Sequence, residues 1–518
     1  MRACHCLSRW AAPNAAAWPF CLLLLAACGG GGSGAGASTP APPASLSYAS
    51  NPANYTVGTA ITPDVPTSTG GAVGTYGISP ALPAGLGLNA STGVISGTPT
   101  VVAPQAVYTV TAANAGGSTS ASLTLGVSRA ILAFAVGPDQ TLAYPNSTSL
   151  SPYLVDLSDE HTTIFPPAAG SNAYLVFAAS RLSGGTGGAV VLQTSDLVNF
   201  SFATSLGYAD QVLASPLAIN QCDATHGAEF DGNYAAPGSV LQDPTLPAGN
   251  LIMLYEAENH CPGGTLSSPF YATIGFARSA DNGKTWPAPV NSALGDATRH
   301  PVLKGADPQP AAPGYLAMGD AIPAAFAERD LDGKAYVYVV YGYHTGTAGT
   351  SDGQLRIARA ALGADPVTFL KWSGGSFSQP GIGGSDSRIT PAPGCTNGYQ
   401  TMADLSYNDD LAAYLLVFVC ANTPMGSQPA AWYYATATSL DRQDWSAPKL
   451  IQNSQFTLTS PCPTLSSGGQ FDGWYPSLMS PGAASGHTRL GGTVFYMNGC
   501  DVGQRQFMAR NFTITTGP

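Results

Sequence analysis

The residues best suited to chemistry in this chain are three carboxylates at the ends of strand-like segments. Asp159 precedes one such segment, Glu258 follows the apolar run Leu251–Tyr255, and Asp320 opens a third segment. Hydrolysis of a glycosidic bond needs two carboxyl groups, one protonated as an acid and one ionised as a base or nucleophile. Position alone assigns Glu258 as the acid and Asp159 as the base.

Polar and aromatic side chains at similar strand ends are expected to bind a ligand beside these carboxylates. They are Asp231, Tyr234, His260, His344, Asp472 and Trp474, with Glu160, His161, Glu256, Asp404 and Tyr475 nearby. Aromatic rings offer flat apolar surfaces to sugar faces. Each residue also has an ordinary structural alternative: Asp320 could cap a turn, one of Glu256 and Glu258 could be solvated, and a lone His344 could be packed.

Five loosely repeated units carry these residues between Arg129 and the C-terminus. Each unit has a short apolar strand, a Gly-containing turn, a stronger strand rich in Tyr or Val, and a third strand. The stronger strands are Ala173–Phe177, Leu251–Tyr255, Ala335–Tyr341, Tyr414–Phe418 and Thr493–Tyr496. Radial repetition of small antiparallel sheets is the β-propeller pattern. We therefore expect an all-β protein whose residues 130–518 form a five-bladed β-propeller.

The composition supports β-structure and excludes several classes of function. Only 9% of residues are charged, and 61 Gly and 42 Pro favour tight turns. The net charge is −11 and there is no Lys/Arg cluster, so no nucleic-acid partner is expected. No phosphate-binding or dinucleotide motif appears, so no cofactor is expected. No Cys-x-x-Cys pair appears, and no metal site is predicted. A monomer is expected.

A smaller all-β domain is predicted over residues 46–128. Leu82-Pro83-Ala84-Gly85-Leu86 and Thr92-Gly93-Val94-Ile95-Ser96-Gly97-Thr98-Pro99 lie between short alternating segments spaced as in a β-sandwich. These residues resemble the Ig-like, cadherin-like modules of bacterial surface proteins, which act as spacers or adhesive units. Some cadherin-like relatives bind calcium, but Asp64 is the only acidic residue here, and calcium needs several oxygen ligands.

The segment Ser279–Trp286 matches the Asp-box, Ser-x-Asp-x-Gly-x-x-Trp, in which Asp and Gly shape a turn and Trp packs between strands. With the repeats, it makes the second domain resemble the five-bladed glycosidase propellers and their sialidase-like cousins. The resemblance implies that Asp320 tunes the catalytic acid. The first-blade Asp-Pro and fourth-blade Glu-Gly motifs of those glycosidases are not clear here. A sialidase would need three arginines, and Arg181, Arg299, Arg329 and Arg388 lie in no recognisable motif.

The propeller framework also suggests how six cysteines pair. In a blade, the innermost strand starts on the face where the second strand ends. Cys222, Cys395 and Cys462 precede innermost strands, and Cys261, Cys420 and Cys500 follow second strands. We therefore expect three disulfides within blades, Cys222–Cys261, Cys395–Cys420 and Cys462–Cys500, which would restrict the unfolded chain.

The N-terminus predicts export and lipid anchoring. Arg2 and Arg9 precede a short apolar run that ends Leu25-Ala26-Ala27-Cys28, which resembles the lipobox of bacterial lipoproteins. The resemblance implies a signal peptide over residues 1–27 and lipidation of Cys28, and Gly29 favours the outer membrane of a Gram-negative cell. Residues 28–45 are rich in Gly, Ser and Pro and predict a flexible tether.

Two functions remain open on these grounds. One is a surface glycoside hydrolase, which requires carboxylates that converge in the centre of the propeller. The other is a non-catalytic lipoprotein that binds glycans or acts as an adhesin, which requires an aromatic-lined groove without that set. In both, the expected partner is carbohydrate, and the membrane is contacted only through the lipid anchor.

Overall fold

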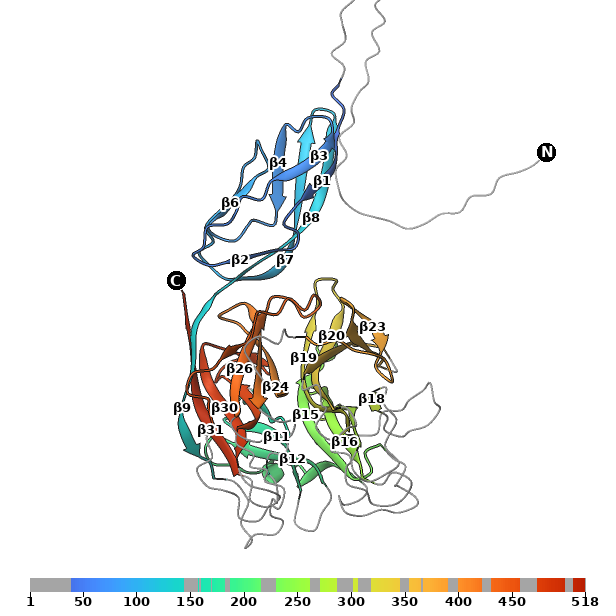
Figure 1. Cartoon of the computed structure of the whole chain (residues 1–518), viewed down its shortest axis with the longest axis vertical. Coiled ribbons are helices and arrows are strands. Elements are labelled where there is room, and N and C mark those ends of the chain that lie inside the picture. The colour runs from blue at the N-terminus through green and yellow to red at the C-terminus, as the bar shows by residue number, and fades with distance from the viewer. Residues whose placement is uncertain are drawn as a thin grey trace, which may run out of the picture.

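The computed structural model places an elongated β-sandwich above a ring of β-sheets (Figure 1). It describes residues 39–143, 157, 160–168, 170–181, 187–215, 230–260, 271–286, 301–305, 318–344, 354–364, 367–389, 399–421, 430–456, 473–498 and 506–517. Within these ranges the chain is all β apart from one 3-10 turn, Ala203–Leu206. None of the described helical structure is long and apolar enough to span a membrane.

The sandwich is an Ig-like module formed by the first eight strands. They are β1 (Pro43–Tyr48), β2 (Ala53–Thr56), β3 (Pro66–Gly70), β4 (Thr75–Ser79), β5 (Leu86–Leu88), β6 (Ile95–Gly97), β7 (Ala103–Asn114) and β8 (Gly117–Ser128). Alternate residues of β7 and β8 enter the core, among them Tyr108, Val110, Leu123 and Leu125. The start of β1 lies in the predicted tether, because Pro43 and Ala44 pair with β3.

Five groups of antiparallel strands form the ring and are its blades, numbered in chain order; the second and third share one nine-stranded sheet. The first contains β10 (Thr163–Phe165), β11 (Tyr174–Arg181), β12 (Gly187–Thr194), β13 (Ser201–Phe202) and β14 (Gln211–Ala214); the second contains β15 (Tyr234–Gln242), β16 (Leu251–Asn259), β17 (Tyr271–Ser279) and β18 (Pro301–Leu303). The third contains β19 (Met318–Arg329), β20 (Ala335–His344), β21 (Leu355–Ala361), β22 (Phe369–Ser373) and β23 (Ser376–Pro380). A short parallel pairing of β17 with β19 joins the second and third blades.

The last two blades complete the ring. The fourth contains β24 (Tyr399–Asn408), β25 (Ala413–Ala421), β26 (Ala430–Ala437) and β27 (Lys449–Leu450), and β29 (His487–Thr488) pairs with β24. The fifth contains β28 (Trp474–Met479), β30 (Gly491–Asn498), β31 (Gln506–Thr516) and β9 (Ile131–Thr141). Because β9 follows the Ig-like module and β31 ends the chain, their pairing closes the ring. The predicted fold class is confirmed.

The predicted Asp-box forms a tight turn at the end of β17. The Ser279 hydroxyl donates to Asp281 Oδ1 over 2.7 Å, and the Trp286 indole donates to the Gly283 carbonyl over 3.0 Å. Gly283 has φ +81°, and a Cβ there would lie 2.6 Å from the Phe177 ring. The ring of Trp286 packs edge-on against Phe177, with centroids 6.3 Å apart, so the turn ties the second blade to the first.

Four of the innermost strands contain a β-bulge near the start, which sets the direction of the side chains around the axis. The register shifts within β15, β19, β24 and β28, and Ile322, Met402 and Tyr475 at three of these shifts have φ of 59°, 50° and 54°. At the fourth, a Cβ on Gly238 would lie 2.1 Å from the Pro323 carbonyl oxygen, so neighbouring bulges touch. Bulges of this kind re-aim side chains beside functional sites.

Candidate active site

The innermost strands begin on the face of the propeller turned away from the Ig-like module. The opposite ends, including Phe326–Arg329 of β19, line a cavity together with Pro104 and Gln105 of the module. Residues that precede or open innermost strands, such as Glu160, Tyr234 and Tyr475, therefore lie at the far end, which we call the mouth.

Three glutamates meet on the mouth side of the axis. Glu160 lies three residues before the start of β10. Glu256 and Glu258 lie two residues apart on β16, so their side chains share one face of that strand. All three are buried, with 2%, 4% and 7% of their surface exposed. The side chain of Glu256 interacts electrostatically with those of both Glu160 and Glu258. Since ionised carboxylates repel one another strongly when they are buried together, this arrangement favours the retention of a proton by the glutamate cluster.

Burial raises the pKa of carboxyl groups in this cluster. Loss of solvent, reinforced by the neighbouring charge of Glu258, raises the pKa of Glu256 to about 8. Burial, followed by the charge of Glu256, raises the pKa of Glu160 well above its ordinary range. A carboxyl group that stays protonated near pH 7 can donate a proton to a leaving group.

Neighbouring groups hold the cluster in place. The Ile322 backbone N–H, at the bulge of β19, donates to Glu256 Oε2 over 2.6 Å. His260 Nε2 lies 2.6 Å from Glu258 Oε2, nearer the mouth. Tyr234 and Tyr475 are buried close by. Burial, then the charge of Glu160, raises the pKa of both phenols, so both keep their O–H.

Below the glutamate cluster, a histidine–aspartate pair crosses the axis. His161 Nε2 lies 2.8 Å from Asp404 Oδ1, and His161 Nδ1 lies 2.9 Å from the Gly238 carbonyl oxygen. The carbonyl can only accept, so Nδ1 donates to it, and Nε2 faces the Asp404 carboxylate. The Leu478 N–H also donates to Asp404 Oδ1 over 3.2 Å. This axial pair thereby links the first, second, fourth and fifth blades.

Asp320 does not join the glutamate cluster. Its carboxylate is fully buried and lies 2.9 Å from Lys371 Nζ, which is also buried. Lys371 Nζ lies 3.7 Å from Asp386, and Asp386 pairs with Arg356 over 2.9 Å. Burial outweighs the attraction of Lys371 and raises the pKa of Asp320 to about 6. The geometry is that of a structural ion pair, and the role expected for Asp320 as a tuner of the acid stays a prediction.

The other expected site residues fall into two groups. Glu258, Tyr234 and His260 lie together at the mouth, and Trp474 packs edge-on against Tyr475 with ring centroids 5.8 Å apart. Asp231 is buried and accepts a 3.4 Å hydrogen bond from the Tyr255 hydroxyl. Asp159, Asp472 and the side chain of His344 lie outside the described residues. Among the residues that are described, no His, Cys, Asp and Glu group has the arrangement of a metal site.

Most of the cysteine and lipid predictions also lie outside the described residues. Cys420, at the end of β25, is disulfide-bonded. Its partner, the other paired cysteines and Cys28 are not described. The three disulfide pairings and the lipidation of Cys28 therefore stay predictions.

Comparisons with known proteins bear on the two domains differently. Residues 40–128 match the family model described as "Putative Ig domain", which confirms the Ig-like resemblance of the first domain. No curated protein sequence matches the chain.

Solved structures similar to the chain are remote in sequence. The catalytic domain of the Coprinopsis cinerea GH62 alpha-L-arabinofuranosidase is 13% identical over 75% of this chain and 98% of that one, with a TM-score of 0.40. An endo-arabinase from Bacteroides thetaiotaomicron is 12% identical over 73% and 98%, with a TM-score of 0.32. An N-acetylgalactosamine deacetylase from F. plautii is 12% identical over 75% and 95%, with a TM-score of 0.38. Since these scores are low, the five-bladed assignment rests on the chain's own sheet pairing.

Proposed function

We propose that the propeller hydrolyses glycosidic bonds at its mouth. The observation that carries the proposal is the buried cluster of Glu160, Glu256 and Glu258, in which burial and mutual repulsion raise the pKa of Glu160 and Glu256. Retention of a proton on a carboxyl group is what a glycosidase acid requires. Trp474 and Tyr475, both largely buried, pack edge-on against each other at the start of β28.

Within the cluster we assign different roles by depth. Glu258 lies two residues nearer the mouth than Glu256 and is the most exposed of the three, so it is the acid that meets the ligand. Glu256 and Glu160 lie behind it and hold the proton. Carboxyl groups packed into one buried cluster are closer together than the two that flank a scissile bond, which lie about 5 Å or more apart. The base is therefore a carboxylate outside the cluster, and Asp159, beside Glu160 in sequence, is our choice.

The test is turnover by the purified protein on a panel of aryl glycosides, plant polysaccharides and host glycans. We expect hydrolysis of at least one substrate, and a loss of about 10²–10⁴-fold in kcat in the Glu258→Gln variant. Asp210→Asn, on the outer rim of the first blade, is the control and should retain full activity. Undiminished turnover in Glu258→Gln would remove Glu258 from the mechanism, and no turnover on any substrate would reject the hydrolase.

The deep burial of the glutamates favours a second candidate, a non-catalytic glycan-binding or adhesin-like protein. A side chain with only 7% of its surface exposed, such as Glu258, has little room to reach a reacting atom. In that case the panel would show no turnover, but labelled glycans would bind at the mouth, and Trp474→Ala would weaken their binding.

We also propose that Cys28 carries the lipid that holds the chain at the outer membrane. Its support is the four-residue lipobox match Leu25–Cys28. Cells fed a radiolabelled fatty acid should label the wild-type protein, and Cys28→Ser should lose both the label and membrane association. Labelling of Cys28→Ser equal to the wild type would place the lipid elsewhere or reject it.

A further inference from the structure

A cavity of about 620 Å³ lies where the Ig-like module meets the propeller, on the face opposite the mouth. Its module side is Pro104 and Gln105, and its propeller side includes residues 326–332 and 438–442. Gln105 Nε2 donates to Thr438 Oγ1 over 3.2 Å, and Asn54 Nδ2 donates to Asp444 Oδ2 over 3.3 Å. These bonds hold the module beside the cavity, which we call the junction cleft.

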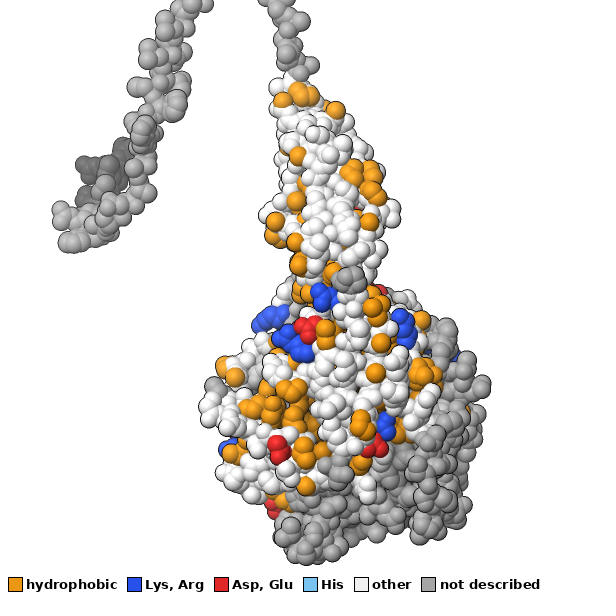
Figure 2. All heavy atoms as spheres, turned by 90° about the vertical axis from the view of Figure 1, so that its left-hand side faces the viewer, with side chains coloured by type: hydrophobic (Ala, Val, Ile, Leu, Met, Phe, Trp, Pro, Cys, Tyr) orange, Lys and Arg blue, Asp and Glu red, His pale blue; other side chains and the backbone are white. Residues whose placement is uncertain are grey.

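Charged side chains are concentrated at this junction. More than a third of the residues that line the junction cleft are Asp, Glu or Arg, whereas only 9% of the chain is charged. Figure 2 shows basic and acidic side chains gathered on the propeller directly beneath the module. A contact that only joins two domains is as well or better stabilised by apolar groups, and few residues of this chain are charged. The enrichment therefore indicates a surface built for a polar ligand.

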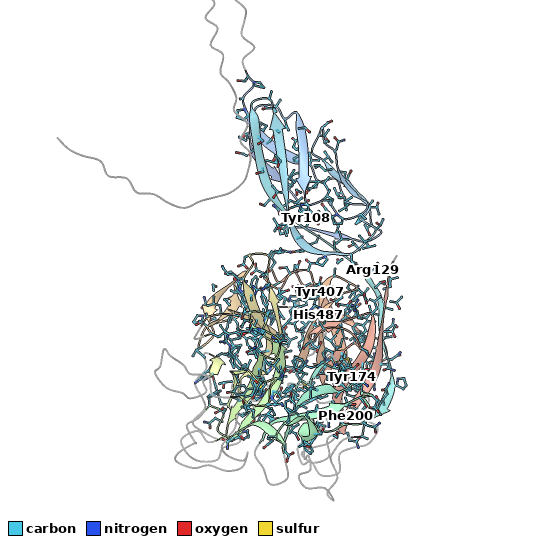
Figure 3. The ribbon with its side chains drawn as sticks, turned by 180° about the vertical axis from the view of Figure 1, so that it is seen from behind. Tyr108, Arg129, Tyr174, Phe200, Tyr407 and His487 are labelled. Carbon is cyan, nitrogen blue, oxygen red and sulfur yellow. The ribbon has the colours of Figure 1, made fainter. Side chains whose placement is uncertain are left out.

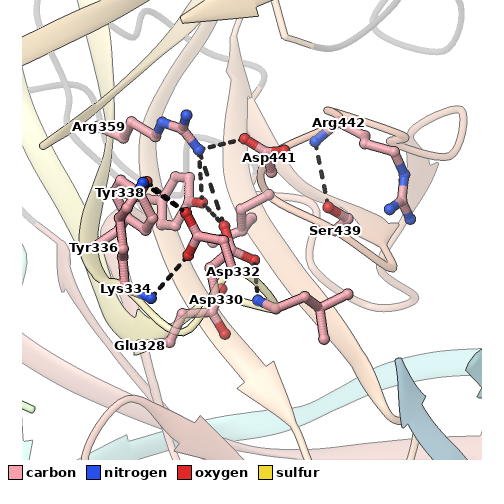
Figure 4. Close-up of polar contacts among 12 residues, drawn as sticks. Glu328, Asp330, Asp332, Lys334, Tyr336, Tyr338, Arg359, Ser439, Asp441 and Arg442 are labelled. Carbon is pink, nitrogen blue, oxygen red and sulfur yellow. Dashed lines mark hydrogen bonds and ion pairs between the residues drawn. The ribbon is translucent and has the colours of Figure 1, made fainter. Parts of the chain in front are cut away.

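One wall of the junction cleft is an arginine held between acids and rings. The Arg359 guanidinium lies over the rings of Tyr336 and Phe377, 4.5 and 4.7 Å from their centroids. It pairs with Asp441 and lies 3.9 Å from Asp330, as Figure 4 shows. The Asp441 side chain is still 47% exposed and that of Asp332 is 43% exposed, so both present oxygens to a ligand.

The other wall is aromatic. Tyr407 packs edge-on against Tyr414 at 5.1 Å, and His487 lies 5.6 Å from both Tyr407 and Phe326. Figure 3 labels Tyr407 and His487 on the side of the propeller next to the module. The Tyr414 hydroxyl donates to Glu328, whose pKa burial raises to about 7. The junction cleft thus combines ring surfaces with hydrogen-bonding groups that are fixed before a ligand arrives.

The balance of charges in the lining limits the chemical class of the ligand. The lining contains three arginines (Arg329, Arg359 and Arg442) and four acids (Glu328, Asp330, Asp332 and Asp441), so neither an anion nor a cation is strongly preferred. A neutral sugar has hydroxyls that donate to carboxylates and accept from guanidinium groups, and C–H faces that lie against rings. The volume falls within the usual range for small-molecule sites, about 300–1,000 Å³.

We propose that the junction cleft is a second carbohydrate-binding site, which takes a neutral mono- or disaccharide unit between the Ig-like module and the propeller. It lies on the other face from the glutamate cluster, so it does not depend on whether that cluster is catalytic. Arg359 and Asp441 supply the hydrogen bonds, and Tyr407 and His487 supply the ring surface.

The test is titration calorimetry of the full-length protein with maltose, cellobiose, xylobiose and lactose, and with glucuronate and glucosamine as charged probes. We expect at least one neutral disaccharide to bind more tightly than both charged probes. Arg359→Ala should weaken it by about tenfold or more. Arg278→Ala is the matched control, because Arg278 lies 5.5 Å from the Phe276 ring and 3.9 Å from Asp243 on another blade.

Further variants keep the test decisive if Arg359→Ala fails to fold. Asp441→Ala removes a half-exposed carboxylate, and Gln105→Trp fills the junction cleft from the module side, so both should weaken binding. Glu258→Gln, at the mouth, should leave the affinity of the junction cleft unchanged, because the two sites lie on opposite faces of the propeller. Binding that survives Asp441→Ala and Gln105→Trp, binding lost only in Glu258→Gln, or no binding by any disaccharide would each overturn the proposal.

Discussion

Replacement of Lys371 by methionine is expected to lower the free energy of unfolding by about 3–5 kcal/mol, because it leaves a buried carboxylate without its cation. Lys371 is 1% exposed, and its Nζ lies 2.9 Å from Asp320 Oδ2 in a part of the third blade that water does not reach. The Asp320 Oδ1 atom is itself buried without a hydrogen-bond partner among the described residues, so Lys371 Nζ is the hydrogen-bond donor that those residues offer this carboxylate.

Guanidinium chloride unfolding at pH 7 measures this loss. The double variant Asp320→Asn with Lys371→Met should recover much of it, because a neutral pair leaves no uncompensated charge. Lys334→Met is the control: the Lys334 side chain is 67% exposed and lies 3.4 Å from Asp332, and a pair of that kind contributes less than about 1 kcal/mol. A Lys371→Met variant as stable as Lys334→Met would contradict the ion-pair interpretation of Asp320.

The stability of the protein is expected to fall as pH rises from about 5 to 8, and Glu256→Gln should remove part of that fall. The pKa of Glu256 is raised from 4.5 to about 8. Between these values the folded chain keeps a proton that the unfolded chain releases, so rising pH favours unfolding. Each proton kept in this way changes the free energy of unfolding by about 1.4 kcal/mol per pH unit.

Urea unfolding at pH 5, 6, 7 and 8 measures how the free energy of unfolding changes with pH in each variant. The free energy of unfolding should fall less steeply with pH in Glu256→Gln than in the wild type up to pH 8. At pH 8 the variant should be the more stable of the two. Glu328→Gln is the matched comparison, because the pKa of Glu328 is raised only to about 7. The contribution of Glu328 to the pH dependence of stability should therefore end near pH 7. Equal slopes for the wild type and Glu256→Gln would show that Glu256 is already ionised in the folded protein.

The sequence was sufficient for the architecture because local chemistry repeats along it. The turn residues from Leu82 to Pro99 predict the Ig-like module, and the Ser279–Trp286 box predicts the turn observed after β17. The five strand units correspond to the five blades. In each case the signal is a short motif whose partners lie within a few residues, so no knowledge of the rest of the fold is needed.

The site could be predicted only in part, because its contacts join residues far apart in the chain. Glu258, Tyr234 and His260 were expected at one face and lie there together with Glu160, whereas Asp159 lies outside the described residues. Asp320 meets Lys371, 51 residues later and on an outer strand, and no motif signals that pairing. The junction cleft requires both domains in place.

The position of β9 has a mechanical consequence. The strand leaves the Ig-like module and runs down the outside of the fifth blade, paired antiparallel with β31 from Ile131 to Thr141 (Figure 1). Tension between a ligand held at the mouth and the N-terminal end of the chain would pull β9 along its own length. Ladder hydrogen bonds lie across the strands, so such a pull loads them together in shear instead of opening them one at a time. The strand that closes the ring is therefore also placed to bear force.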